Sequence, residues 1–153
     1  MSYMQNGLSV TALGVGDAFS ALYYSSCLLL EAEGGRILVD CPHPIRKLLR
    51  EAAAPDLTEI DAVLLTHLHA DHASGLEGYG YFSFFARGRK APLITHPAVA
   101  ERLWPAHLAA GMERLMRASA SSGLAGMSAL ASDGCCSMKT VWRRLLSTSG
   151  WSA

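Results

Sequence analysis

Short apolar runs alternate with amphipathic stretches along most of the chain, which is the pattern of a mixed α/β domain. Apolar runs over 8–13, 27–31 and 36–40 predict three strands. A Gly-Gly turn signal at 34–35 separates the second run from the third, so we expect these strands to form a meander. The run over 61–66, DAVLLT, has the length and branching of a buried strand.

Two helices are predicted on either side of that buried strand. Apolar side chains recur at i, i+3, i+4 and i+7 from Ile45, which predicts a helix that ends at Pro55. Ser74 and Glu77 have the spacing of a capping box, in which two side chains bind free backbone N–H groups at a helix start. They predict that the second helix begins near Ser74.

A short strand over 92–95 and a helical stretch over about 97–116 complete the predicted elements. Pro105 and Gly111 interrupt the helical stretch, because proline lacks a backbone N–H and glycine is a poor helix former.

The chain changes character near residue 118. In 118–153, nine of the 36 residues are serine, and no period of 2 or 3.6 is sustained. We therefore divide the chain into 1–117, the N-terminal part of a domain, and 118–153, a low-order Ser/Ala/Gly-rich tail. The tail is either a flexible segment or a displaced reading frame.

Composition narrows the function classes. Half of the 153 residues are hydrophobic, and 13 basic side chains balance 13 acidic ones, so the net charge is zero. This composition excludes global disorder, and a neutral chain is poorly suited to non-specific binding of nucleic acid or of an anionic membrane. No apolar run approaches the roughly 18 residues of a membrane span, and no Lys or Arg precedes Arg36, so we expect no membrane segment and no signal peptide.

The four cysteines are scattered along the chain, at Cys27, Cys41, Cys135 and Cys136. Their spacing does not predict a disulfide framework, which favours a cytoplasmic setting.

The residues suited to metal chemistry are concentrated in HLHADH, His67 to His72, directly after the DAVLLT strand. Residues two apart in extended chain point the same way, so His67 and His69 can hold one ion together. Asp71 and His72 follow a bend and would face a second ion. Imidazole and carboxylate ligands suit zinc, with manganese or iron as competitors. Two ions about 3.5–4 Å apart can turn a shared water into a nucleophile, whose proton Asp71 can accept.

The segment THLHADH, followed by Ser-Gly-Leu at 74–76, resembles the HxHxDH signature of the metallo-β-lactamase superfamily. This resemblance covers about 8–117. Three further segments resemble its ribonuclease Z-like branch: LGVGD at 13–17, SSCL at 25–28 and ILVD at 37–40. That branch includes tRNA 3′-processing nucleases and cyclic-phosphate phosphodiesterases.

The resemblance implies an αββα sandwich, of which this chain carries only the first half. It assigns His67 and His69 to a first zinc ion, and Asp71 and His72 to a second, with Asp71 also the catalytic proton acceptor. Asp40 matches an acidic position near the metal centre that usually does not bind the metal directly, although an Asp turn that ends the strand explains it equally well.

The ligands that complete the family site, a later His, a bridging Asp and a final His, have no clear match. After His72 the remaining histidines are His96 and His107. His96 is either a residue near the metals or a capping histidine before Pro97, and His107 is expected at a surface or interface. Cys135 and its neighbour have weak ligand spacing.

Two function classes remain open. The first is a zinc-dependent hydrolase, a phosphodiesterase or ribonuclease Z-like nuclease that acts through a metal-bound hydroxide on a phosphodiester or other small ester. RNA is compatible with this branch but gains no support from the neutral charge. The second is a truncated remnant or half-domain that keeps HxHxDH without catalysis. A homodimer would cover the apolar face that half a sandwich leaves exposed.

Overall fold

The computed structural model describes residues 2–5 and 7–113. The chain divides into two units, 1–111 and 112–153, and the architecture below is that of the first unit. The predicted tail, 118–153, with Cys135 and Cys136, lies outside the described residues.

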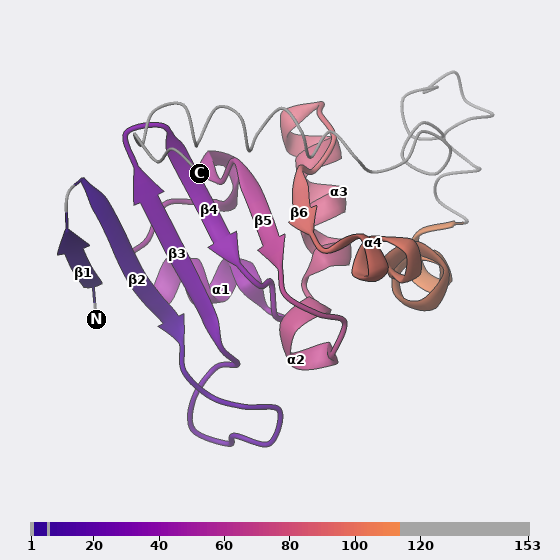
Figure 1. The fold of residues 1–153 in the computed structure, drawn as a ribbon, viewed down its shortest axis with the longest axis horizontal. Coiled ribbons are helices and arrows are strands. Elements are labelled where there is room, and N and C mark those ends of the chain that lie inside the picture. Colours follow the sequence, from indigo (N-terminus) through magenta and orange to yellow (C-terminus); the bar gives the residue numbers. More distant parts are fainter. Residues whose placement is uncertain (1, 6, 114–153) are drawn as a thin grey trace. The chain divides into compact units, whose positions relative to one another are not determined.

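Six strands form one sheet in the order β1-β2-β3-β4-β5-β6 (Figure 1). Their bounds are Ser2–Gln5 (β1), Leu8–Gly14 (β2), Cys27–Ala32 (β3), Gly35–Val39 (β4), Ala62–Leu65 (β5) and Leu93–Thr95 (β6). The pairs from β1 to β4 are antiparallel, so the predicted meander is confirmed. The pairs β4–β5 and β5–β6 are parallel. The sequence pattern did not predict β1.

Helical segments connect the parallel strands and follow the last one. Their bounds are Ile45–Glu51 (α1), Leu57–Glu59 (a 3₁₀ turn), Ala70–Ala73 (α2), Leu76–Arg87 (α3), Pro97–Leu103 (α4) and Trp104–Leu108 (a π-helical turn). The predicted interruption near Pro105 is therefore a widened turn that follows directly on α4. None of the helices among the described residues has the length and apolar character needed to span a membrane.

The capping box predicted at Ser74 and Glu77 is wrong. Helix α3 begins after Gly75, which makes no side-chain cap, and the Ser74 hydroxyl instead accepts a hydrogen bond from the His43 backbone N–H at 2.9 Å. The capping box of this fold lies at Asp56, before the 3₁₀ turn. The spacing rule fails here because the Ser74 hydroxyl bonds to His43, in the loop after β4, and not to the backbone of α3.

Helices α1 and α3 pack on one face of the sheet (Figure 1). The core between them contains Leu29, Leu38 and Val63 from the strands, Leu48 and Leu49 from α1, and Leu76 and Tyr79 from α3. On β3 the alternation is clear, since Leu29 is 1% exposed and its neighbour Leu28, which points to the opposite face, is 36% exposed.

The parallel strands place the candidate site. In a parallel sheet the carboxyl ends of neighbouring strands meet at one edge. Val39 pairs with Leu64, and Leu65 pairs with Thr95, so the chain leaves β4, β5 and β6 at the same edge. Asp40, the HLHADH segment and His96 all follow directly from these strand ends.

Candidate metal centre

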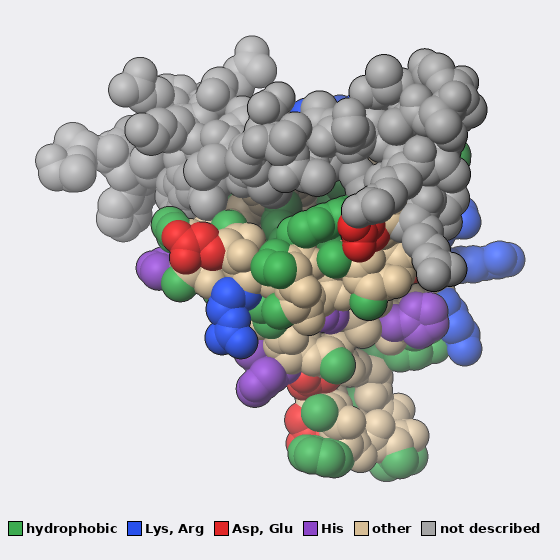
Figure 2. Space-filling model, turned by 90° about the vertical axis from the view of Figure 1, so that its right-hand side faces the viewer, with side chains coloured by type: hydrophobic (Ala, Val, Ile, Leu, Met, Phe, Trp, Pro, Cys, Tyr) green, Lys and Arg blue, Asp and Glu red, His purple; other side chains and the backbone are tan. Residues whose placement is uncertain are grey.

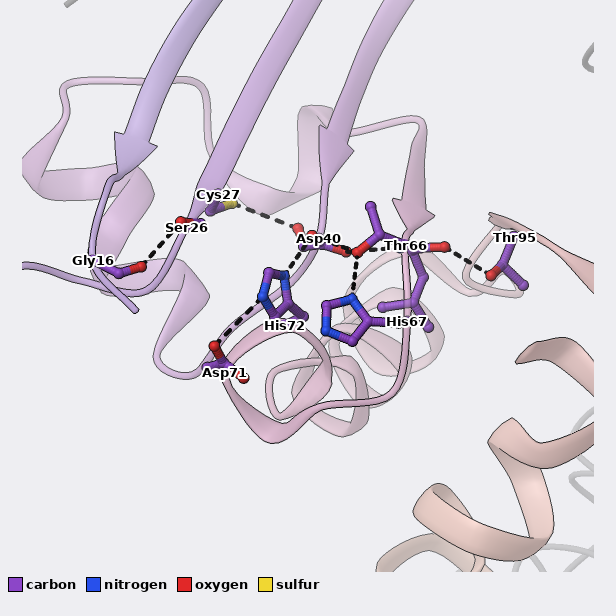
Figure 3. Close-up of polar contacts among 10 residues, drawn as sticks. Gly16, Ser26, Cys27, Asp40, Thr66, His67, Asp71, His72 and Thr95 are labelled. Atoms are coloured by element: carbon purple, nitrogen blue, oxygen red, sulfur yellow. Dashed lines mark hydrogen bonds and ion pairs between the residues drawn. The ribbon is translucent and has the colours of Figure 1, made fainter. Parts of the chain in front are cut away.

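Asp40 connects the ends of β4 and β5. Asp40 is 4% exposed, and its carboxylate accepts hydrogen bonds from the Thr66 backbone N–H at 2.8 Å and from the Thr66 hydroxyl at 2.9 Å. It also lies 2.7 Å from Nδ1 of His72 (Figure 3). Asp40 has a positive φ of 63°, which aspartate tolerates better than most residues. Asp40 thus ends the strand and also contacts the motif, and its place beside a metal centre stays a prediction.

These contacts fix the orientation of two imidazoles. A carboxylate only accepts hydrogen bonds, so the short contact to Asp40 places the N–H of His72 on Nδ1. The Thr66 hydroxyl donates to Asp40 and therefore accepts from Nδ1 of His67, at 2.9 Å. When either ring is neutral, this arrangement leaves the lone pair on Nε2, and a metal ligand needs that lone pair.

The free Nε2 of His72 lies 3.4 Å from the Asp71 carboxylate. In a neutral His72 with its N–H on Nδ1, two acceptors face each other across this gap, and a cation between them, a proton or a metal ion, satisfies both. Donor atoms about 2.0–2.1 Å from a tetrahedral zinc ion are about 3.3–3.4 Å apart. The pair of His72 and Asp71 therefore fits two ligands of one ion.

His67 lies close to both other histidines of the motif. Its ring centroid is 4.6 Å from that of His69 and 4.2 Å from that of His72. His69 is exposed, while His67 and His72 are half-buried. The structure thus brings together all four predicted ligands, His67, His69, Asp71 and His72.

The donors do not close into a complete metal site. Within the part of the chain that the structure describes, no three His, Cys, Asp or Glu side chains are arranged to hold an ion. Figure 2 shows the side of the molecule that lies to the right in Figure 1, where histidine side chains reach the surface at several places. The side chains of the motif are of types that bind metals, and the pair of Asp71 and His72 has the spacing of two ligands of one ion. Among the described residues no third side chain is positioned to join them.

The loop after β4 holds the short helix that carries two of these donors. The Cys41 backbone N–H donates to the His72 carbonyl at 2.8 Å, and the Gly75 N–H donates to the Cys41 carbonyl at 2.7 Å. A Cβ on Gly75 would lie 2.5 Å from the Pro42 carbonyl oxygen. Only glycine allows this close approach of the two segments.

His96 is a helix cap. Its Nδ1 accepts a hydrogen bond from the Ala98 backbone N–H at 3.2 Å, and the side chain is exposed. The structure thus supports the capping interpretation and shows no contact between His96 and the motif. His107, expected at a surface or interface, is half-buried, and its Nε2 lies 3.1 Å from the Ala73 carbonyl oxygen.

The buried cysteines are not candidate ligands. Burial raises the pKa of the Cys27 thiol to about 12, with a smaller contribution from the Asp40 charge. Burial likewise raises the pKa of Cys41. Because metals bind the thiolate, these protonated thiols serve packing. The Cys27 Sγ lies 3.5 Å from the Asp40 carbonyl oxygen, to which it donates.

Thr66 is a residue of the site that the sequence interpretation missed. Its hydroxyl joins Asp40 to His67, yet the motif gave no signal beyond the position of a threonine directly before the first histidine. The link depends on the register of β4 and β5, which the sequence pattern does not specify.

The sequence is similar to one described family. The profile of the family "Anti-Pycsar protein Apyc1" matches residues 8–131. The protein of that name from Saccharibacillus brassicae is 36% identical over 105 residues, 69% of this chain and 43% of that protein. The one from Bacillus phage 010DV004 is 38% identical over 111 residues, 71% of this chain and 43% of that protein. The chain spans less than half the length of these curated relatives.

Solved structures with the same fold include the metallo-β-lactamase fold protein YhfI from Bacillus subtilis. It matches with a TM-score of 0.53 and 24% identity, over 64% of this chain and 40% of that chain. A diphosphatase from the PhnP family matches with a TM-score of 0.50 and 21% identity, over 64% of this chain and 45% of that chain. The predicted metallo-β-lactamase-like α/β fold is confirmed, and the similarity covers part of each of these proteins.

Proposed function

This chain belongs to the Anti-Pycsar protein Apyc1 family, and on that premise we propose that it is a metal-dependent hydrolase of phosphodiester bonds. Within this proposal we favour a cyclic nucleotide as substrate, because the family is linked to removal of a cyclic-nucleotide signal. This choice agrees with the cyclic-phosphate phosphodiesterases of the ribonuclease Z-like branch, and that branch assignment stays a prediction.

One observation carries the proposal. The Asp71 carboxylate faces Nε2 of His72 at 3.4 Å, while Nδ1 of the same ring is held by Asp40 at 2.7 Å. A histidine that binds a metal through one ring nitrogen usually donates the N–H of its other nitrogen to a carboxylate, as Nδ1 of His72 does to Asp40.

Each residue has a proposed task. His67 and His69 would hold one ion, and Asp71 and His72 the other, while Asp40 orients His72 from behind. A bound zinc ion, or manganese or iron in its place, supplies Lewis-acid chemistry that activates water and offsets phosphoryl charge. Asp71 is the acceptor for the proton of the attacking water, since its carboxylate lies on the Nε2 side of His72, where the ion would be held.

A second candidate is a chain that keeps the motif but does not hydrolyse. It is favoured by the lack of a third donor in place among the described residues, and by a match that spans 43% of each of these curated relatives. In this case the motif would bind an ion weakly, and activity would need the remaining ligands from elsewhere.

The two candidates are separated by an assay of the purified full chain with zinc or manganese. The hydrolase proposal expects release of product from a cyclic nucleotide that stops when a chelator is added. Asp71→Asn should lose this activity, whereas His96→Asn, which keeps the helix cap and removes an imidazole, should retain it. An inactive wild-type chain under every metal tested would favour the second candidate.

We also infer a cytoplasmic setting, because Cys27 and Cys41 are free thiols in the buried core. The division at residue 117 and the homodimer stay predictions.

A further inference from the structure

His107 contacts the helix of the metal motif from a distant part of the chain. It lies in the π-helical turn Trp104–Leu108, and its Nε2 is 3.1 Å from the carbonyl oxygen of Ala73, 34 residues earlier. A carbonyl only accepts, so Nε2 is the donor. Ala73 is directly adjacent to His72 and is 0% exposed, so no bulk water can replace this donor.

Helix α2 depends on such outside contacts. It has four residues, Ala70–Ala73, and a helix of one turn is not stable by itself. Three successive groups at its end are bound from outside. The His72 carbonyl accepts from Cys41, the Ala73 carbonyl from His107, and the Ser74 hydroxyl from His43.

The contact from His107 differs from the other two. Cys41 and His43 are neighbours in the loop after β4, so their two bonds hold α2 from a single segment. His107 holds it from the stretch that follows β6. The widened turn around Pro105, a type of turn frequent at functional sites, is where this side chain leaves the helix.

We propose that His107 is a positioning residue for the metal centre, and that its N–H fixes the end of α2 so that Asp71 and His72 keep their relative orientation. Its effect on metal binding and turnover rests on the proposed function. Its effect on the order of α2 does not. Small displacements of such donors are costly, because metal binding and catalysis both depend on their geometry.

The test compares His107→Leu, which removes the donor at similar volume, with His107→Gln, whose amide N–H can replace Nε2. Tyr81→Phe is the matched control. It removes a 3.0 Å hydrogen bond from α3 to the Gly111 carbonyl, which leaves α2 untouched. Two quantities are measured: the hydrogen exchange rate of the backbone amides from His72 to Gly75 in metal-free protein, and the zinc dissociation constant by chelator competition.

His107→Leu should speed amide exchange in this segment and weaken zinc binding, each by about tenfold or more. His107→Gln and Tyr81→Phe should stay within about threefold of wild type. Where the chain turns over substrate, His107→Leu should lower kcat with KM little changed.

Unchanged exchange in a folded His107→Leu protein would overturn the proposal. If that variant does not fold, His107→Gln decides, because a folded Gln variant with fast exchange would show that the donated hydrogen bond is not what holds α2. A wild-type chain that binds no zinc would count against the proposed function, and the exchange measurement on metal-free protein would still decide the role of His107.

Discussion

The Asp40 carboxylate lies 2.7 Å from Nδ1 of His72, although 32 residues separate them in the chain. The parallel pairing of β4 and β5 brings the two together at one edge of the sheet. Asp40 occupies a left-handed backbone conformation that only a few residue types tolerate. The backbone of Asp40 therefore ends strand β4, and its carboxylate holds His72 of the motif.

Asp40→Asn should weaken metal binding at His72 by about 10–100-fold, the range found when the hydrogen-bond partner of a metal ligand is removed. Asparagine tolerates the left-handed backbone and keeps an acceptor for Thr66, but it lacks the charge that holds the imidazole N–H. The fold should therefore persist. Zinc affinity by chelator competition, with circular dichroism to verify folding, measures the effect.

Asp40→Gly is the companion to that variant. It relieves the backbone conformation and removes the carboxylate contacts to Thr66 and His72, so zinc affinity should fall further than in Asp40→Asn. Equal affinity in wild type and both variants would show that Asp40 ends the strand and does nothing for the site.

Gly75→Ala should destabilise the domain by about 1–3 kcal/mol, the usual cost of forcing an added methyl into a packed place. The new Cβ would meet the Pro42 and Cys41 carbonyl oxygens at 2.5 and 2.7 Å, and backbone atoms cannot move aside as a flexible side chain can. Urea denaturation of both proteins gives the difference in the free energy of unfolding.

Gly78→Ala provides the control within the same region. Gly78 lies inside α3 and a Cβ there meets nothing within 4 Å, so alanine should stabilise the helix by about 0.5–1 kcal/mol. If alanine lowers the free energy of unfolding at Gly75 and raises it at Gly78, the effect at Gly75 comes from contact of its Cβ with the loop. A stable Gly75→Ala protein would contradict the described packing.

The sequence pattern predicted the strands well, because the apolar positions of a strand are those that it buries, and here they are buried between the sheet and helices α1 and α3. It found β2 to β6 and α1, and it placed HLHADH after a buried strand. It missed β1, Ser2–Gln5, because an edge strand with exposed Tyr3 and Met4 carries little apolar signal.

The contacts that assemble the site could not be predicted in the same way. Asp40 and His107 reach Thr66, His72 and Ala73 through strand register and helix placement, over separations of 26, 32 and 34 residues. Sequence rules that compare residues a few positions apart cannot predict contacts over such separations. The capping box shows the same limit, because Ser74 has the right spacing yet binds the His43 N–H.

Cys27 should make the domain sensitive to alkaline pH. Burial raises its pKa from 9.0 to about 12, so the folded state holds the thiol proton more tightly than the unfolded state does. This contribution to stability is complete below pH 9 and is lost as the pH rises from 9 toward 12. Urea midpoints at pH 7.5 and 10 should differ more in wild type than in Cys27→Ala. Equal pH dependence in the two proteins would show that the thiol ionises normally in the folded state.

The full chain should bind fewer than two equivalents of zinc tightly. The motif supplies four donors, and no set of three is in place among the described residues, whereas zinc sites with an open position use three protein ligands each. Metal content after dialysis is the measurement. Two retained ions per chain would show that further ligands complete the site.

His69→Ala should separate metal binding from stability. The His69 ring is exposed and lies against the His67 ring, with 4.6 Å between the centroids, so removing it should change the free energy of unfolding by no more than about 0.5 kcal/mol. It should still abolish any phosphodiester hydrolysis, since the proposed first ion would keep one imidazole from this segment.

His72→Ala is the contrasting variant, because His72 is half-buried and bonded to Asp40, so both stability and hydrolysis should fall. Cys135→Ala should leave hydrolysis unchanged. Turnover of a cyclic nucleotide with added zinc or manganese, together with thermal melts, tests all three variants.

An active His69→Ala protein would remove HLHADH as the catalytic centre, and an inactive Cys135→Ala protein would point to the tail as the source of the missing ligand. Loss of hydrolysis in His69→Ala at unchanged stability would instead tie the chemistry to the metal ligands, since in that variant the fold loses nothing except one exposed imidazole.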